Sequence, residues 1–218
     1  MTDSNQMTPD TSASDARRRL MAAAASLFAT HGYAAVSIDQ IAAAVGATKG
    51  LYYHHFKAKA DVLAEIVSAA RAEALNAAST ALGAVAPDAP AEKRIAALAE
   101  GELTAALAAP EIHRVAAEAN DLLAQERISP GFQPLADAAT RDREALERLY
   151  QDAYREGVKT GRLEPLPPRF AVWLIRLPIL AAAEWAATPE GARTPADRVA
   201  EAVARFAAKG LLETDLDD

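Results

Sequence analysis

Residues 49–55, Lys-Gly-Leu-Tyr-Tyr-His-His, place an ammonium, two phenols and two imidazoles around a single glycine. Lys49 can donate hydrogen bonds to O6 or N7 of guanine, and Gly50 has no side chain to keep a base at a distance. Tyr53 and His55 can donate hydrogen bonds to phosphate oxygens. The chemistry that these residue types offer is contact with the bases and phosphates of DNA.

A short helix must precede this stretch to hold it against DNA, and the sequence predicts one at about 38–45. Ser37 and Gln40 have the spacing of a capping box, which starts a helix. Gly46 can adopt the left-handed conformation that ends it. The hydroxyl of Ser37 and the free N–H groups of this helix N-terminus suit a phosphate.

A second helix is predicted from 49 to about 56, because Thr48 is a favourable N-cap and the intervening turn is short. Thr48 places a second hydroxyl at a helix N-terminus, where an anion is favoured. Tyr52 and Phe56 lie four residues apart and are expected to face the core, while Tyr53 points outward. Together the two helices are predicted to form a helix-turn-helix.

Basic charge is confined to this part of an otherwise acidic chain. The 218 residues carry a net charge of −7, yet residues 16–60 contain six basic residues against one acid. Residues 61–218 contain 17 basic and 26 acidic residues. Positive charge therefore lies where phosphate neutralisation would require it.

The stretch Gly46-Ala-Thr-Lys-Gly-Leu-Tyr-Tyr-His-His-Phe-Lys-Ala-Lys59 resembles the tetracycline-repressor (TetR) family of bacterial transcriptional regulators, and the resemblance runs from about Arg17 to Leu63. Carried over position by position, it implies base contacts at Lys49 and Gly50. It implies phosphate contacts at Ser37, Thr48, Tyr53, His55 and Lys59. One departure is Tyr52, where the family usually has Leu, and its hydroxyl must find a partner or solvent.

The whole chain is predicted to be all-α, because Ala, Leu, Glu and Arg dominate and no β-alternating run occurs. Nine helices are expected, at about 15–31, 38–45, 49–56, 58–85, 91–108, 110–126, 134–161, 167–187 and 194–212. We expect a disordered tail at 1–13, a helix-turn-helix domain at 14–60 and a further domain at 61–218. The long fourth helix, roughly 40 Å at 1.5 Å per residue, would act as a lever between the two domains.

Beyond residue 63 the resemblance covers only the arrangement of helices, and it implies a ligand-binding and dimerisation domain. Polar and aromatic residues among apolar ones are the candidates for a cavity wall: His113, Asn120, Tyr150, Tyr154, Trp173 and Arg176. Core packing or surface exposure is the alternative for each of them. The stretch 154–163, followed by prolines and a Trp-bearing helix, is similar to family members that respond to fatty acyl-CoA or other lipid-like molecules.

Residues 170–185 are apolar nearly all round, so one face can pack on its own domain and another on a twofold mate. We expect a homodimer whose interface includes Trp185. Arg176 and Glu184 lie eight residues apart, too far to pair within one helix, and are expected to pair between the two chains.

Other classes of function lack the residues they require. The chain has no His-Glu-x-x-His, no glycine-rich phosphate loop and no cysteine, so we expect neither an enzyme nor a bound cofactor. His54 and His55 point about 100° apart on a helix, which argues against a metal site. No signal peptide or membrane span is recognisable, which predicts the cytoplasm. The sequence therefore predicts a ligand-responsive repressor that binds double-stranded operator DNA as a homodimer, the alternative being a helical small-molecule-binding protein that does not bind an operator.

Overall fold

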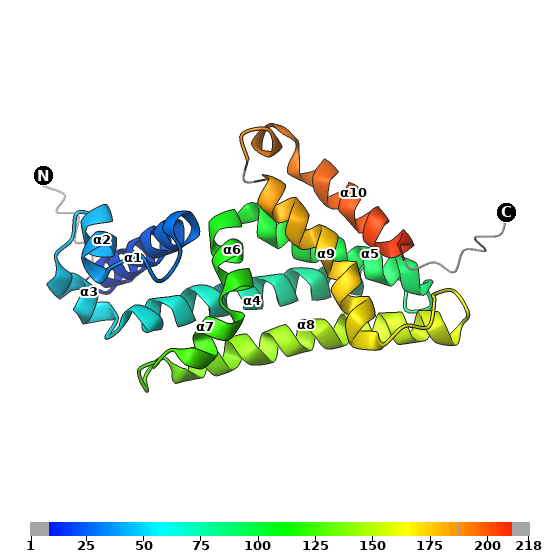
Figure 1. Ribbon diagram of the computed structural model, residues 1–218, viewed down its shortest axis with the longest axis horizontal. Coiled ribbons are helices and arrows are strands. Elements are labelled where there is room, and N and C mark those ends of the chain that lie inside the picture. The colour runs from blue at the N-terminus through cyan, green and yellow to red at the C-terminus, as the bar shows by residue number, and fades with distance from the viewer. Residues whose placement is uncertain (1–8, 187, 211–218) are drawn as a thin grey trace, which may run out of the picture.

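The computed structural model describes residues 9–186 and 188–210, apart from the side chains of residues 9–13, 120 and 121. Over these residues the chain forms ten α-helices, one short 3-10 helix and no strand, which confirms the all-α prediction (Figure 1). The helices are α1 Pro9–His31, α2 Ile38–Ala44, α3 Lys49–His55, α4 Lys59–Gly83, α5 Ala91–Ala108, α6 Pro110–Glu118, α7 Asn120–Gln125, α8 Gln133–Lys159, α9 Pro168–Ala186 and α10 Ala196–Lys209, with the 3-10 helix at Gly191–Arg193.

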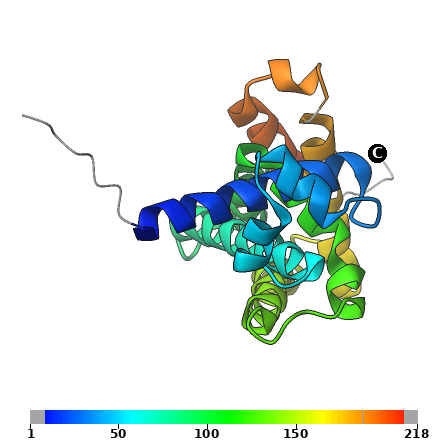
Figure 2. The same ribbon diagram turned by 90° about the vertical axis from the view of Figure 1, so that its left-hand side faces the viewer.

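Two helix boundaries differ from the sequence-based expectation. The expected helix at 110–126 is two helices, because Ala119 leaves the helical conformation with φ −84° and ψ 3°. Residues 9–13, assigned to a disordered tail by composition, form the first turns of α1. Figure 2 shows the start of α1 extending outward from the other helices. Residues 1–8 of the expected tail lie outside the described residues.

Helices α1, α2 and α3 enclose the first of two hydrophobic cores. Leu20 and Phe28 of α1, Ile41 of α2 and Tyr52 of α3 are buried in it together with Phe56. Each of these helices thus packs through one apolar face, which leaves its opposite face in solvent.

Helix α4 joins this core to the second one, as Figure 1 shows. Leu63 and Ile66, near its start, belong to the first core, whereas Ala74 and Ala78 belong to the second. The second core is completed by α5, α8, α9 and α10. One continuous helix, α4, is therefore part of both cores.

Small residues bring α4 and α5 into close contact. A Cβ added to Gly101 of α5 would lie 2.5 Å from the carbonyl oxygen of Ala77 in α4, so only glycine fits there. Such close packing makes α4 and α5 respond to one another's position. Among the described helices, none is long and apolar enough to cross a membrane.

Candidate DNA-binding surface and ligand cavity

Helix α3 presents one face to solvent and anchors the other in the first core. Tyr52 and Phe56 are fully buried, as predicted, and Tyr53 is 40% exposed. Lys49 and Gly50, at the start of the helix, are exposed. The buried pair fixes how α3 is rotated, and so fixes which side chains face outward.

The start of each short helix is capped as the sequence predicts. Ser37 accepts a hydrogen bond from the backbone N–H of Gln40 at 3.2 Å, and the Gln40 side chain accepts one from the backbone N–H of Ser37 at 2.8 Å. Gly46 has the left-handed φ of 67°, which turns the chain between the helices. The Thr48 hydroxyl accepts from the N–H of Leu51 at 3.4 Å. Both hydroxyls are exposed at helix N-termini, where anion binding is favoured.

The hydroxyl of Tyr52 has a partner inside the chain. It donates to the carbonyl oxygen of Ala58 at 3.0 Å, and burial raises the pKa of this phenol. Ala58 lies immediately before α4, so this bond ties α3 to the start of the long helix. The ring of Tyr52 thus lies in the first core while its hydroxyl bonds to the chain.

Lys49 is held by an exposed ion pair and by nothing else that the structure describes. Its Nζ lies 3.1 Å from Asp39 of α2, and this hydrogen bond raises the pKa of Lys49. Exposed ion pairs contribute little free energy, so Lys49 can exchange Asp39 for a nucleic-acid acceptor. A Cβ at Gly50 would lie 3.6 Å from Thr48 Oγ1, an ordinary contact, so the fold itself does not require glycine there.

Two of the expected phosphate contacts are placed differently by the structure. The Nε2 of His55 is buried and has no hydrogen-bond partner among the described residues, and burial lowers the pKa of this imidazole. The ammonium of Lys59 donates to the carbonyl oxygens of Tyr33 at 2.7 Å and Val36 at 2.9 Å. It also lies over the Tyr33 ring, at 4.2 Å from the centroid. Lys59 therefore secures the loop between α1 and α2, and its contact with a phosphate stays a prediction.

The loop between α7 and α8 bonds to the start of α4. The buried Asp61 accepts hydrogen bonds from the backbone N–H groups of Lys57 and Ala58, and also from that of Ser129 in this loop, each at 2.9 Å. Asp61 thus caps α4 and holds the loop with a single carboxylate.

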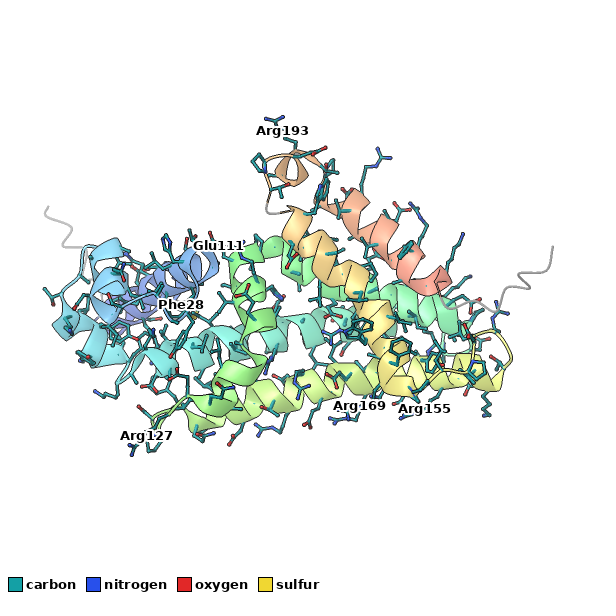
Figure 3. All side chains as sticks on the ribbon, viewed as in Figure 1. Phe28, Glu111, Arg127, Arg155, Arg169 and Arg193 are labelled. Atoms are coloured by element: carbon teal, nitrogen blue, oxygen red, sulfur yellow. The ribbon has the colours of Figure 1, made fainter. Side chains whose placement is uncertain are left out.

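Aromatic and ionic contacts strengthen the same junction. The guanidinium of Arg17 lies 5.2 Å from the Phe56 ring centroid and 5.3 Å from that of Phe132, and it pairs with Glu65 at 2.6 Å. Further along α1, Ser26 donates to Glu111 of α6, which Figure 3 labels, at 3.2 Å. Contacts other than α4 therefore also connect the two parts of the chain.

A cavity of about 620 Å³ lies between α4, α5, α6, α8 and α9. Three of the predicted wall residues, His113, Trp173 and Arg176, line it. Tyr150 and Tyr154 are instead core residues: Tyr150 donates to Glu102 at 2.9 Å, and Tyr154 donates to the Glu164 carbonyl at 2.7 Å. The side chain of Asn120 lies outside the described residues.

Arg176 pairs with Glu102 of its own chain, a partner that the sequence did not indicate. Its Nε donates to the buried Glu102 at 3.1 Å, and its second nitrogen bonds the same carboxylate. Although burial opposes the charged form, Glu102 raises the pKa of Arg176. Glu184 is exposed and lines the cavity. Glu102 lies 74 positions away in sequence and could not be placed beside Arg176 without the fold, while the pairing of Arg176 with Glu184 of a second copy stays a prediction.

Sequence reasoning missed several charged residues of the cavity wall, chiefly Arg71, Arg114 and Arg143. The sequence did contain an indication for Arg71. Arg71 lies four residues after the buried Val67 and three before the buried Ala74, on the apolar side of α4. A charged residue in such a position indicates a polar cavity or a buried partner.

Large apolar side chains are exposed in two places in the described chain. Leu51 and Tyr53 are exposed on α3, and the remaining six lie on α9 and α10: Phe170, Trp173, Leu177, Leu180, Trp185 and Phe206. Clustered exposed apolar residues of this kind mark interaction surfaces.

Comparison with known proteins connects the three-helix unit to a family. Residues 20–66 match the family model described as bacterial regulatory proteins, tetR family. The HTH-type transcriptional repressor KstR2 of Mycolicibacterium smegmatis is 40% identical over 63 residues, a match that spans 28% of this chain and 31% of the repressor.

Solved structures extend the similarity of fold to nearly the whole chain. A tetR-family regulatory protein from Rhodococcus RHA1 has a TM-score of 0.71 at 23% identity, covering 92% of this chain and 98% of that one. The ketosteroid regulator KstR2 of Mycobacterium tuberculosis has a TM-score of 0.73 at 19% identity, covering 91% and 95%. Residues 20–66 thus match the tetR family of bacterial regulatory proteins, and over most of its length the chain shares the fold of solved structures described as regulators of that kind.

Proposed function

We propose that this chain is a ligand-responsive repressor that binds operator DNA as a homodimer. The observation that carries the proposal is the orientation of α3, whose buried Tyr52 and Phe56 direct Lys49, Gly50 and Tyr53 outward. Lys49 and Gly50 would meet base edges, while Tyr53 and the capping hydroxyls of Ser37 and Thr48 would meet phosphates. The match to a protein named as a transcriptional repressor supports the sign of regulation.

A second copy of this chain is the partner that we assign to the apolar surface of α9 and α10. A single helix-turn-helix gains affinity by occupying two half-sites about 34 to 36 Å apart, which requires a dimer. Phe170, Trp173, Leu177 and Leu180 recur along α9 at helical spacing, and Phe206 of α10 is 68% exposed. A twofold interface can bury such a surface against itself.

Ligand binding in the cavity would release the DNA through α4. Ala70, Arg71 and Ala74 of α4 line the cavity, and the same helix begins beside α3. To shift the population from 99:1 to 1:99, the ligand must favour the released state by about 5.5 kcal/mol.

A gel-shift experiment tests the assignment of the DNA-binding face. DNA enriched by the wild-type protein from a randomised pool is titrated with Lys49→Ala, with Tyr53→Ala and with a control, Lys159→Ala, an exposed lysine at the end of α8. We expect each of the first two variants to lose at least tenfold in affinity, and the control to bind like wild type. If both α3 variants bind like wild type, the assignment is wrong, and a helical ligand-binding protein without operator binding is favoured instead.

A further inference from the structure

We propose that the cavity between α4, α6, α8 and α9 binds an amphipathic anion: an apolar body carrying one carboxylate or phosphate group. Its anionic group would lie among Arg71, Arg114 and Arg143, and its apolar body against α9. This proposal names the chemical class of the effector and rests on the proposed function of the cavity as an effector site.

Positive charge converges on the cavity from four helices. Arginines of α4, α6, α8 and α9 line it, five in all, together with His113. Four glutamates also line it, but two of them are already paired with arginines: Glu102 with Arg176, and Glu147 with Arg143 at 2.9 Å. The other two, Glu118 and Glu184, are exposed. The wall therefore carries one more arginine than glutamate, and the carboxylates of Glu102 and Glu147 are already bonded to arginines.

Arg114 has a buried N–H group, at Nε, that lacks a hydrogen-bond acceptor among the described residues. Buried N–H donors in folded proteins nearly always have a partner, so this one is suited to an acceptor that arrives with a ligand. Guanidinium groups bind carboxylate and phosphate oxygens in preference to neutral acceptors.

The closeness of Arg71 to other guanidinium groups also favours an anionic ligand. Burial and the nearby guanidinium groups of Arg143 and Arg176 lower the pKa of Arg71 to about 10, although Glu147 opposes the shift. An anion placed among these groups would offset the repulsion between them. A neutral ligand would leave the repulsion unchanged.

The rest of the wall fits an apolar body. Leu146 of α8 and Val172, Trp173, Ile179 and Leu180 of α9 line the same cavity. A volume of about 620 Å³ is within the usual range for small-molecule sites. A smaller hollow of about 440 Å³ shares Arg71 and Arg143 with the cavity, and its other polar lining residues are Gln133, Asp137 and Thr140. A larger anionic head group has room to extend there beside the two arginines.

Calorimetric titration of the wild-type protein tests the ligand class without any substitution. The probes share one twelve-carbon chain and differ in the head group: dodecanoate, dodecyl phosphate, the thioester dodecanoyl-coenzyme A, dodecanol and dodecylamine, each below its micelle concentration. We expect at least one of the three anions to bind tenfold or more tightly than dodecanol, and dodecylamine to bind most weakly. A preference for the thioester over the free acid would place the head group in the second hollow. Equal binding of the alcohol and all three anions, or tightest binding of the amine, would overturn the proposal.

A pair of variants tests the position of the anionic group. Arg114→Gln should weaken binding of the preferred anion at least tenfold and change dodecanol binding less than twofold, with circular dichroism confirming the fold. The matched control is Arg155→Gln, an exposed arginine of α8 outside the cavity wall, which should bind like wild type. If Arg114→Gln and Arg143→Gln both keep wild-type affinity for the anion, the proposed position is wrong. A protein that still binds its selected DNA but shows no preference for anions would contradict this proposal alone, whereas loss of DNA binding by the wild type would contradict the proposed function.

Discussion

A substitution at Gly50 can test the stability of the fold and the proposed DNA binding separately. Its backbone is helical and the fold has room for a Cβ, so Gly50→Ala should keep the free energy of unfolding or raise it by up to about 1 kcal/mol. The added methyl group lies on the outward face of α3, so affinity for the selected DNA should fall at least tenfold. Denaturant unfolding and gel shifts of the same preparation measure both quantities. Unchanged DNA affinity would remove Gly50 from the base-contacting set.

Tyr52 should contribute mainly to the stability of the three-helix unit. Tyr52→Phe keeps the buried ring and removes only the hydrogen bond to the Ala58 carbonyl, so the free energy of unfolding should fall by about 1 kcal/mol. Equilibrium denaturation with urea measures the change. A variant as stable as wild type would show that this bond has no net effect.

At the scale of single residues, the sequence was informative where local periodicity decides the orientation. The four-residue spacing of Tyr52 and Phe56 correctly predicted a buried pair, and the capping box at Ser37 is present. The contacts of Lys59 were not predicted, because its ammonium is held by carbonyls 23 and 26 residues earlier in the chain. Contacts of that separation follow from the tertiary fold and not from local spacing.

At the scale of elements, Asp61 connects α4 to the loop between α7 and α8. Asp61→Ala would leave the N–H groups of Lys57, Ala58 and Ser129 without their acceptor, and we expect the free energy of unfolding to fall by about 3 kcal/mol. Amide hydrogen exchange should also become faster at Ser129. Asp88→Ala, in an exposed loop, is the control that should leave both measurements unchanged.

The sequence indicated where most helices lie better than it indicated whether a helix is interrupted. Pro110 and the proline-rich stretch at 164–168 correctly indicated where helices begin and end. The break at Ala119 has no Gly or Pro beside it, so only the packing of α6 and α7 reveals it. The opposite case is Pro178, which lies inside α9 without ending it.

At the scale of the whole molecule, the proposed dimer depends on the apolar surface of α9 and α10. Placing a charge there, with Leu177→Asp and Phe206→Asp combined, should shift the protein from dimer to monomer, because an unpaired buried charge is costly. Sedimentation velocity measures the oligomeric state. Arg205→Ala, an exposed neighbour on α10, should leave the protein dimeric. A dimer that survives the double substitution would place the interface elsewhere.

The division of charge along the chain was visible in the sequence, but the cavity was not. Its arginines come from positions between 71 and 176, and only the packing of four helices brings them together. Arg176 was among the predicted wall residues and lines the cavity. Its partner Glu102 was not predicted, because the two residues lie 74 positions apart in the sequence.

Recognition of DNA by α3 is tested most directly by selection of bound sequences from a randomised DNA pool, with the wild-type protein and the Lys49→Ala and Tyr53→Ala variants run in parallel. Wild type should enrich an inverted repeat whose half-site centres lie about 34 to 36 Å apart or at a multiple of that distance, and neither variant should enrich it. Enrichment of no sequence by wild type, or of the same repeat by all three proteins, would contradict the proposal that α3 reads operator DNA through Lys49, Gly50 and Tyr53.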